Sequence, residues 1–157
     1  MRTGSKLIFF LFVASACVGC DQVAKTVAQT TFARESKTLL GGMLHFTYAE
    51  NPGAFLSLGA DLHPELRFWV FVVLAAVALV GALALALIYK ADWLQLFAAA
   101  LMVGGGCGNL IDRINLGVVR DFAQIHLWHV STGIFNLADA VIMLGCVLLL
   151  IVPRANR

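Results

Sequence analysis

The sequence has little charge: only 13% of its 157 residues are Asp, Glu, Lys or Arg, and the formal net charge is +2. It has no basic stripe with interleaved aromatic residues, so we expect no nucleic acid as a partner. It contains no His-Glu-x-x-His motif, which argues against zinc-dependent hydrolysis. Ser57 and Ser131 lie outside any nucleophile-elbow motif, which argues against a serine nucleophile.

Two small groups of residues could bind a metal or do redox chemistry. Cys17-x-x-Cys20 lies in an apolar segment without a second cysteine pair, where cysteine usually acts as a small hydrophobic residue. His45, His126 and His129 are possible metal ligands, although the aromatic neighbours of the last two favour an interface. We therefore predict no metal and no cofactor.

Apolar residues dominate the chain. They make up 61% of the residues, and the mean hydropathy is +0.88, which is typical of a membrane protein. Four apolar runs predict transmembrane helices at approximately residues 7–24, 68–89, 93–111 and 134–152. The first run also resembles a secretory signal that ends near Cys20, which leaves a cleaved lipoprotein or membrane anchor as an alternative.

Residues 28–64 differ from the apolar runs because their polarity is mixed. Residues 43–48 alternate in size and polarity, which predicts a strand, and Asn51-Pro52-Gly53 predicts a turn. Residues 117–133 are interpreted as a polar, aromatic loop. The predicted fold is an α-helical membrane protein: four transmembrane helices, with a small extramembrane β element between the first and second, in a single domain over residues 1–157.

An even number of spans places both termini on one side of the membrane. Five basic residues cluster on that side, which is therefore predicted to be cytoplasmic: Arg2, Lys6, Lys90, Arg154 and Arg157. The protein is predicted to be multi-pass, with its functional face directed outward.

The same topology brings four acids to the outer face: Asp21, Asp112, Asp121 and Asp139. Acids near membrane depth are costly and therefore indicate function. Two close carboxylates share a proton, so that one activates a water as a base while the other acts as an acid on a carbonyl. Such a pair can hydrolyse a peptide bond. A small proton- or ion-coupled transporter is the alternative, although no internal repeat is visible.

Two asparagines each precede one of these acids by three residues: Asn109 precedes Asp112, and Asn136 precedes Asp139. On a helix, such pairs share a face. The asparagines either orient a carboxylate or substrate group, or simply fasten helices together.

Two charged contacts are predicted from spacing alone. Asp21 and Lys25, at i and i+4, fit a structural pair at a helix end. Asp112 is interpreted as paired with its neighbour Arg113.

Five motifs occur in an order that resembles the lipoprotein signal peptidases, the bacterial type II signal peptidases, over nearly the whole chain. They are Asp21-Gln22-Val23-Ala24-Lys25, Asn51-Pro52-Gly53-Ala54-Phe55, Gly108-Asn109-Leu110-Ile111-Asp112-Arg113, Val119-Arg120-Asp121-Phe122 and Phe135-Asn136-Leu137-Ala138-Asp139.

The resemblance implies an intramembrane aspartyl endopeptidase of the bacterial inner membrane. It would remove signal peptides from prolipoproteins by cleaving before the diacylglyceryl-modified cysteine. By motif, Asp121 and Asp139 match the catalytic pair. The substrate-binding or supporting residues would be Asp21, Lys25, Asn51, Gly53, Asn109, Asp112, Arg113, Asn136 and Ala138. The family also implies an outer β-cradle and no metal, and we expect a monomer in contact with membrane lipid.

The chain departs from the family pattern at two places. Many members have two small residues where this chain has only Ala54, and many have Val-Val-Asp where it has Val119-Arg120-Asp121. If that stretch is extended, Arg120 should face away from Asp121. If it is not, the charge of Arg120 should favour the ionised form of Asp121.

Overall fold

The computed structural model describes residues 3–53, 59, 61–88 and 92–151, and these residues are mostly helical. The described helices are α1 (Thr3–Phe32), α2 (Pro64–Ile88), α3 (Trp93–Leu116) and α4 (Leu137–Ile151). The strands are β1 (Lys37–Leu39), β2 (Leu44–Asn51), β3 (Val119–Leu127) and β4 (Val130–Ser131), with a short 3-10 turn, η1 (Leu40–Gly42), after β1.

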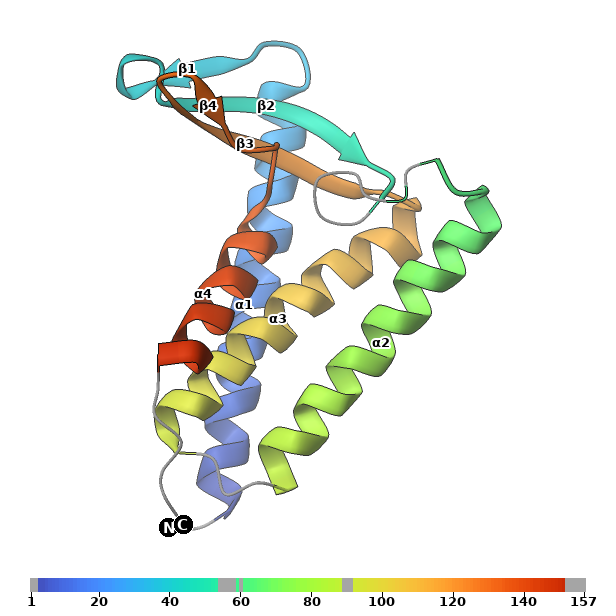
Figure 1. The fold of residues 1–157 in the computed structure, drawn as a ribbon, viewed down its shortest axis with the longest axis vertical. Helices are drawn as coiled ribbons and strands as arrows, with labels where there is room; N and C mark the ends of the chain where they lie inside the picture. Colours follow the sequence, from blue (N-terminus) through green and yellow to red (C-terminus); the bar gives the residue numbers. More distant parts are fainter. Residues whose placement is uncertain (1–2, 54–58, 60, 89–91, 152–157) are drawn as a thin grey trace.

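The helix α3 lies at the centre of the bundle and packs against α1, α2 and α4 (Figure 1). Its glycines allow this close approach. A Cβ atom at Gly104 would lie 2.7 Å from the Ala14 carbonyl oxygen of α1, and one at Gly105 would lie 2.6 Å from the Ala138 carbonyl oxygen of α4. Small residues serve the same purpose at membrane helix interfaces generally.

Among the residues that the structure describes, two helices are long and apolar enough to cross a membrane: residues 4–32 and residues 93–116. The helix α4 is apolar but shorter, with 15 residues. Large apolar side chains point outward from the bundle, for example Phe12, Val80 and Leu150, which are 72%, 67% and 85% exposed. Such a surface suits contact with lipid rather than water.

Several helix boundaries differ from the predicted spans, and three of the differences affect the site. The helix α1 continues to Phe32 instead of ending near residue 24, so Asp21 and Lys25 lie inside the helix and not at its end. The helix α3 extends to Leu116 and therefore includes Asp112. The helix α4 starts at Leu137 rather than at residue 134. Apolar runs mark the lipid-facing part of a helix, whereas the extensions of α1 and α3 carry polar residues of the site, including Lys25 and Asp112.

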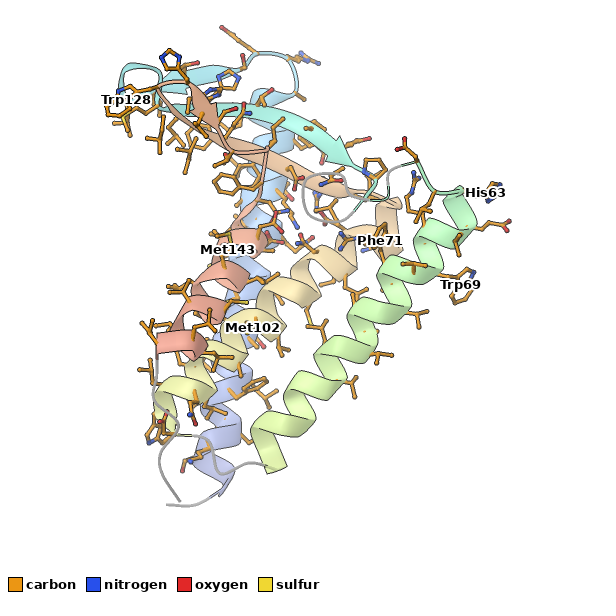
Figure 2. The ribbon with its side chains drawn as sticks, viewed as in Figure 1. His63, Trp69, Phe71, Met102, Trp128 and Met143 are labelled. Atoms are coloured by element: carbon orange, nitrogen blue, oxygen red, sulfur yellow. The ribbon has the colours of Figure 1, made fainter. Side chains whose placement is uncertain are left out.

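A four-stranded antiparallel sheet, in the order β1-β2-β3-β4, lies across one end of the bundle (Figure 1). The start of α1 and the end of α4 lie at the opposite end. The side chain of Trp128, on the turn between β3 and β4, is fully exposed at the tip of the sheet, far from the helices (Figure 2).

The prediction of a β element confined to the segment between the first two helices was incomplete. Strands β1 and β2 do lie there, but β3 and β4 lie between α3 and α4, where a loop was predicted. The inner half of β3 is buried on both faces, so it lacks the polar alternation that identifies a half-exposed strand. Its partner is β2, about 70 residues earlier, with Ala49 opposite Asp121 and Asn51 opposite Val119.

Candidate active site

The first turn of α4 is closed by a reciprocal pair of hydrogen bonds. The Asp139 amide donates to Asn136 Oδ1 at 3.0 Å, and the Asn136 amide donates to Asp139 Oδ2 at 3.2 Å. This arrangement is a capping box, which satisfies amide groups that the helix itself leaves without partners. It also places the Asp139 carboxyl at the positive end of the helix dipole, where a negative charge is stabilised.

The side chain of Asn136 connects this turn to the sheet. Its Nδ2 donates to Asp121 Oδ1 at 2.6 Å and to Asn109 Oδ1 at 3.1 Å. Since its Oδ1 already accepts from Asp139, the amide uses one acceptor and both donor hydrogens. Asn136 is completely buried. Asn136 therefore links Asp121 of β3 to the first turn of α4: its side chain binds the Asp121 carboxyl and the Asp139 amide, and its backbone amide binds the Asp139 carboxyl.

Asp121 is buried in the strand β3, with an exposed fraction of 2%. Burial raises the pKa of its carboxyl from 3.8 to about 6, and the charge of Asp139 acts in the same direction. Two amide donors oppose this rise: Asn51, which donates to Asp121 Oδ2 at 3.0 Å, and Asn136. The raised pKa makes Asp121 able to hold a proton close to neutral pH.

Asp139 is only half-buried, so its carboxyl is more accessible than that of Asp121. Its Oδ1 accepts a hydrogen bond from Asn109 Nδ2 at 2.8 Å. The Asn109 Oδ1 in turn accepts from Lys25 Nζ at 2.8 Å. Through these contacts the orientation of Asp139 depends on a cation buried inside the bundle.

Lys25 is fully buried and is surrounded by acceptors. Besides Asn109, its ammonium contacts Asp21 Oδ2 at 2.7 Å and Asp112 Oδ2 at 3.3 Å. The predicted pairing of Asp21 with Lys25 is therefore confirmed. The other oxygen of Asp21 accepts the backbone amide of Ala138 at 2.9 Å, which attaches α1 to the first turn of α4.

The predicted pairing of Asp112 with Arg113 is wrong. Asp112 binds Arg120 at 2.8 Å as well as Lys25, whereas the side chain of Arg113 leaves α3 in another direction. Adjacent residues on a helix do not face each other, so neighbours in sequence rarely pair there. The Nη2 of Arg113 donates to the Gly53 carbonyl at 3.0 Å, and its guanidinium lies 5.8 Å from the Phe71 ring centre.

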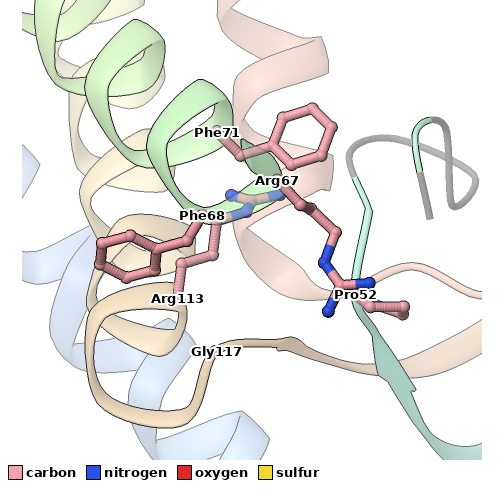
Figure 3. A pocket seen from close by; sticks show the side chains of 6 residues that line it. All are labelled: Pro52, Arg67, Phe68, Phe71, Arg113 and Gly117. Atoms are coloured by element: carbon pink, nitrogen blue, oxygen red, sulfur yellow. The ribbon is translucent and has the colours of Figure 1, made fainter. Parts of the chain in front are cut away.

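A pocket opens beside Arg113 between α2, the end of α3 and the turn after β2 (Figure 3). In Figure 3 the side chain of Arg113 extends from α3 toward Phe68 and Phe71 of α2. The residues that line the pocket are Pro52, Arg67, Phe68, Phe71, Arg113 and Gly117. The buried Nε of Arg113 has no hydrogen-bond partner within the described part of the chain. This pocket offers a donor to a polar group on a partly apolar ligand.

All eleven residues singled out from the sequence belong to one connected network of contacts. Gly53 completes it, because its amide donates to Asn51 Oδ1 at 3.0 Å. Three further polar residues take part that the sequence did not single out as site residues: Gln22, Gln29 and Arg120. Arg120 was noticed only as a departure from the family pattern, and the two glutamines gave no signal.

The histidine alternative gains nothing from the structure. The rings of His45 and His126 lie edge to face, with centres 6.0 Å apart. Within the described ranges, no three His, Cys, Asp or Glu side chains gather closely enough to hold a metal ion.

Residues 13–153, most of the chain, match the family model described as signal peptidase (SPase) II. The chain belongs to the signal peptidase II family. A lipoprotein signal peptidase from Moorella thermoacetica is 37% identical over 153 residues, covering 94% of this chain and 96% of the relative. One from Syntrophus aciditrophicus is 35% identical over 158 residues, covering 96% and 94%.

The fold of this chain also matches solved structures. One structure, described as that of a bacterial membrane enzyme, superimposes with a TM-score of 0.79 at 27% identity and covers 91% of this chain and 85% of its own. A second gives a TM-score of 0.80 at 27% identity and covers 91% and 90%. The predicted family, the signal peptidase II activity and a membrane location are confirmed, and the transporter and anchor alternatives receive no support.

Proposed function

We propose that Asp121 and Asp139 are the catalytic pair and that they act on one water molecule to cleave a prolipoprotein before its diacylglyceryl-modified cysteine. The main support is Asn136, whose amide contacts both carboxylate-bearing residues, at 2.6 Å and 3.0 Å. Asn136 thereby links Asp121 of β3 to Asp139 of α4, two acids that are 18 residues apart in the sequence. Relatives named lipoprotein signal peptidases support prolipoproteins as the substrate class.

In the proposed reaction Asp121 begins protonated and Asp139 ionised. Asp139 takes a proton from the water as its oxygen adds to the scissile carbonyl carbon, while Asp121 donates its proton to the carbonyl oxygen. The tetrahedral intermediate then collapses. The carbon–nitrogen bond breaks as Asp139 gives its proton to the leaving amine, and Asp121 takes back a proton from a hydroxyl of the intermediate as the carbonyl re-forms. The products are the signal-peptide acid and a free cysteine amine, and both acids return to their starting states. The raised pKa of Asp121 supports this assignment of the proton.

The remaining residues are proposed to position this pair and the substrate. Asn51 and Asn109 each donate to one carboxylate. Lys25 balances the buried acids beneath them. Arg113, at the rim of the pocket, is placed to donate to a carbonyl group of the substrate backbone. No metal is part of this proposal.

The membrane arrangement we propose is one domain with four spans, both termini in the cytoplasm and the sheet at the outer face of the inner membrane. The start of α1 and the end of α4 lie together at the end of the bundle away from the sheet, which supports this orientation (Figure 1). A lipid-modified cysteine stays in the bilayer, so the substrate should reach the acids laterally. The protein is proposed to act as a monomer, because one chain supplies both carboxylates, from β3 and α4.

The proposal is tested by cleavage of a synthetic diacylglyceryl-modified precursor by the purified protein, with and without a chelator. We expect full activity with the chelator and none in Asp121→Asn or Asp139→Asn, both folded. Asp92→Asn is the matched control: Asp92 caps α3 on an exposed loop, and asparagine caps helices equally well. Asp112→Asn should retain partial activity. If Asp112→Asn alone abolishes cleavage, or if Asp121→Asn is fully active, the assigned pair is wrong.

A further inference from the structure

Arg120 occupies the position directly before the proposed catalytic Asp121, yet its side chain points the other way. Residues 119–127 form the extended strand β3, and successive side chains of a strand point to opposite faces. Asp121 therefore faces Asn51 and Asn136, while Arg120 faces α1 and α3. The extended alternative considered from the sequence is the one that the structure shows.

The guanidinium of Arg120 is almost completely enclosed, with a side-chain exposure of 10%. Its Nη2 donates to Asp112 Oδ1 at 2.8 Å and to Gln22 Oε1 at 3.0 Å. Its Nε lies 3.3 Å from Asp112 Oδ2, and its Nη1 lies 3.5 Å from Gln29 Oε1. The contact with Asp112 uses two nitrogens and two oxygens, which gives a planar pair a defined orientation.

The same carboxylate also holds the backbone of β3. Asp112 Oδ2 accepts the Arg120 amide at 3.0 Å, on the edge of the strand that β2 does not occupy. Two residues farther on, the amides of Phe122 and Ala123 both donate to the Phe135 carbonyl. The peptide that carries Asp121 is thus fixed on both sides, by Asp112 before it and by Phe135 after it.

Arg120 also completes the balance of buried charge. Asp21 and Asp112 carry two negative charges, and Lys25 and Arg120 carry two positive ones. Without Arg120, Asp112 would share a single ammonium with Asp21, and Gln22 would lose one of its partners. Removing one member of a buried ionic group leaves the others uncompensated, and they rearrange or take up water.

We propose that Arg120 is a positioning residue for catalysis: through its paired contacts with Asp112 and Gln22, it holds the peptide of Asp121 at the distance from Asp139 that the reaction requires. This proposal rests on the assignment of Asp121 and Asp139 as the catalytic pair. Arg120 does not face the carboxyl of Asp121 and has no role in the proton transfers. Its action is geometric and should appear in kcat rather than in substrate affinity.

The test compares kcat and KM of purified Arg120→Met, Arg120→Lys and Gln22→Met on the lipidated precursor, each normalised to folded protein. Misplacement of a catalytic group by about 1 Å can cost roughly 100-fold in rate, so we expect kcat of Arg120→Met to fall roughly 10- to 100-fold. KM should change less than about twofold, because uniform binding is untouched. Arg34→Met, which removes an exposed arginine beyond α1, is the matched control and should behave as the wild type.

Arg120→Lys keeps the charge but loses the two-nitrogen contact, so kcat should be restored only in part. A Gln22→Met variant should show a smaller fall than Arg120→Met, because Asp112 keeps the guanidinium. Wild-type kcat in folded Arg120→Met would overturn the proposal. If Arg120→Met does not fold, wild-type kcat in Arg120→Lys would overturn it instead. The activity of Asp121→Asn distinguishes failure of the Arg120 proposal from failure of the catalytic pair. A fully active Asp121→Asn variant would refute the catalytic pair itself.

Discussion

The pH dependence of cleavage should reveal which acid carries the shared proton, and Asn51→Leu is the most informative change. The alkaline limb of kcat/KM reports the pKa of the acid in the free enzyme, so it should lie near the value of about 6 for Asp121. Asn51 donates to Asp121 Oδ2 at 3.0 Å and so favours the ionised form. Removing this donor should raise the pKa of Asp121.

The size of the shift follows from the strength of the lost contact. A hydrogen bond to a charged group contributes about 1.5 to 3 kcal/mol, which corresponds to roughly one to two pH units. The protonated, active form should therefore persist to higher pH, and the alkaline limb should move upward by that amount. The maximal rate should fall as well, because the carboxyl loses a positioning contact.

The assay measures kcat/KM for the lipidated precursor from about pH 5 to about pH 9, a range that includes the pKa of Asp121 before and after the expected shift. Asn115→Leu, an equivalent change at an exposed site near the end of α3, should leave the limb in place. An unmoved alkaline limb in folded Asn51→Leu would refute the role given to the hydrogen bond. Movement of the acidic limb instead would show that Asp121 is the base and Asp139 the acid.

Three further predictions concern stability, measured by unfolding in detergent. Lys25→Met should destabilise the protein by about 3 to 5 kcal/mol, because it leaves two buried carboxylates without their shared cation; a loss below 1 kcal/mol (about the value of an exposed pair) would contradict this. Gly108→Ala should cost about 1 to 3 kcal/mol, because its Cβ would lie 2.5 Å from Asp21 Oδ2, whereas Gly19→Ala, with nothing within 4 Å, should cost nothing. Because folding raises the pKa of Asp121, the wild type should lose up to about 3 kcal/mol relative to Asp121→Asn as the pH rises from about 4 to 6, with no further change above.

Several parts of this molecule follow directly from local sequence. Hydrophobic runs identify the helices, because lipid-facing positions must be apolar. The i, i+4 spacing of Asp21 and Lys25 predicts their pairing, and the same geometry is observed inside α1. The three-residue spacing of Asn136 and Asp139 corresponds to the reciprocal cap of α4. In each case the interaction closes within about one helical turn.

The sequence-based predictions that were wrong or incomplete involve contacts between distant segments. The strand β3 was missed because its partner lies about 70 residues away and its inner half is buried on both faces. The partner of Asp112 was assigned to its neighbour Arg113, although the observed partner, Arg120, comes from the following strand. The division of labour among the acids depends on burial and on Asn136, and neither can be read from spacing.

The three connections of Asn136 have a consequence for how the enzyme tolerates its surroundings. Bilayers differ in thickness, and helices adapt by tilting. A catalytic distance set by the relative tilt of several helices would vary with the lipid. Here one rigid amide, with both hydrogens and its oxygen in use, acts as a spacer between the sheet and the first turn of α4. We therefore expect the gap between Asp121 and Asp139 to change little when the bundle tilts, so cleavage should depend only weakly on bilayer thickness.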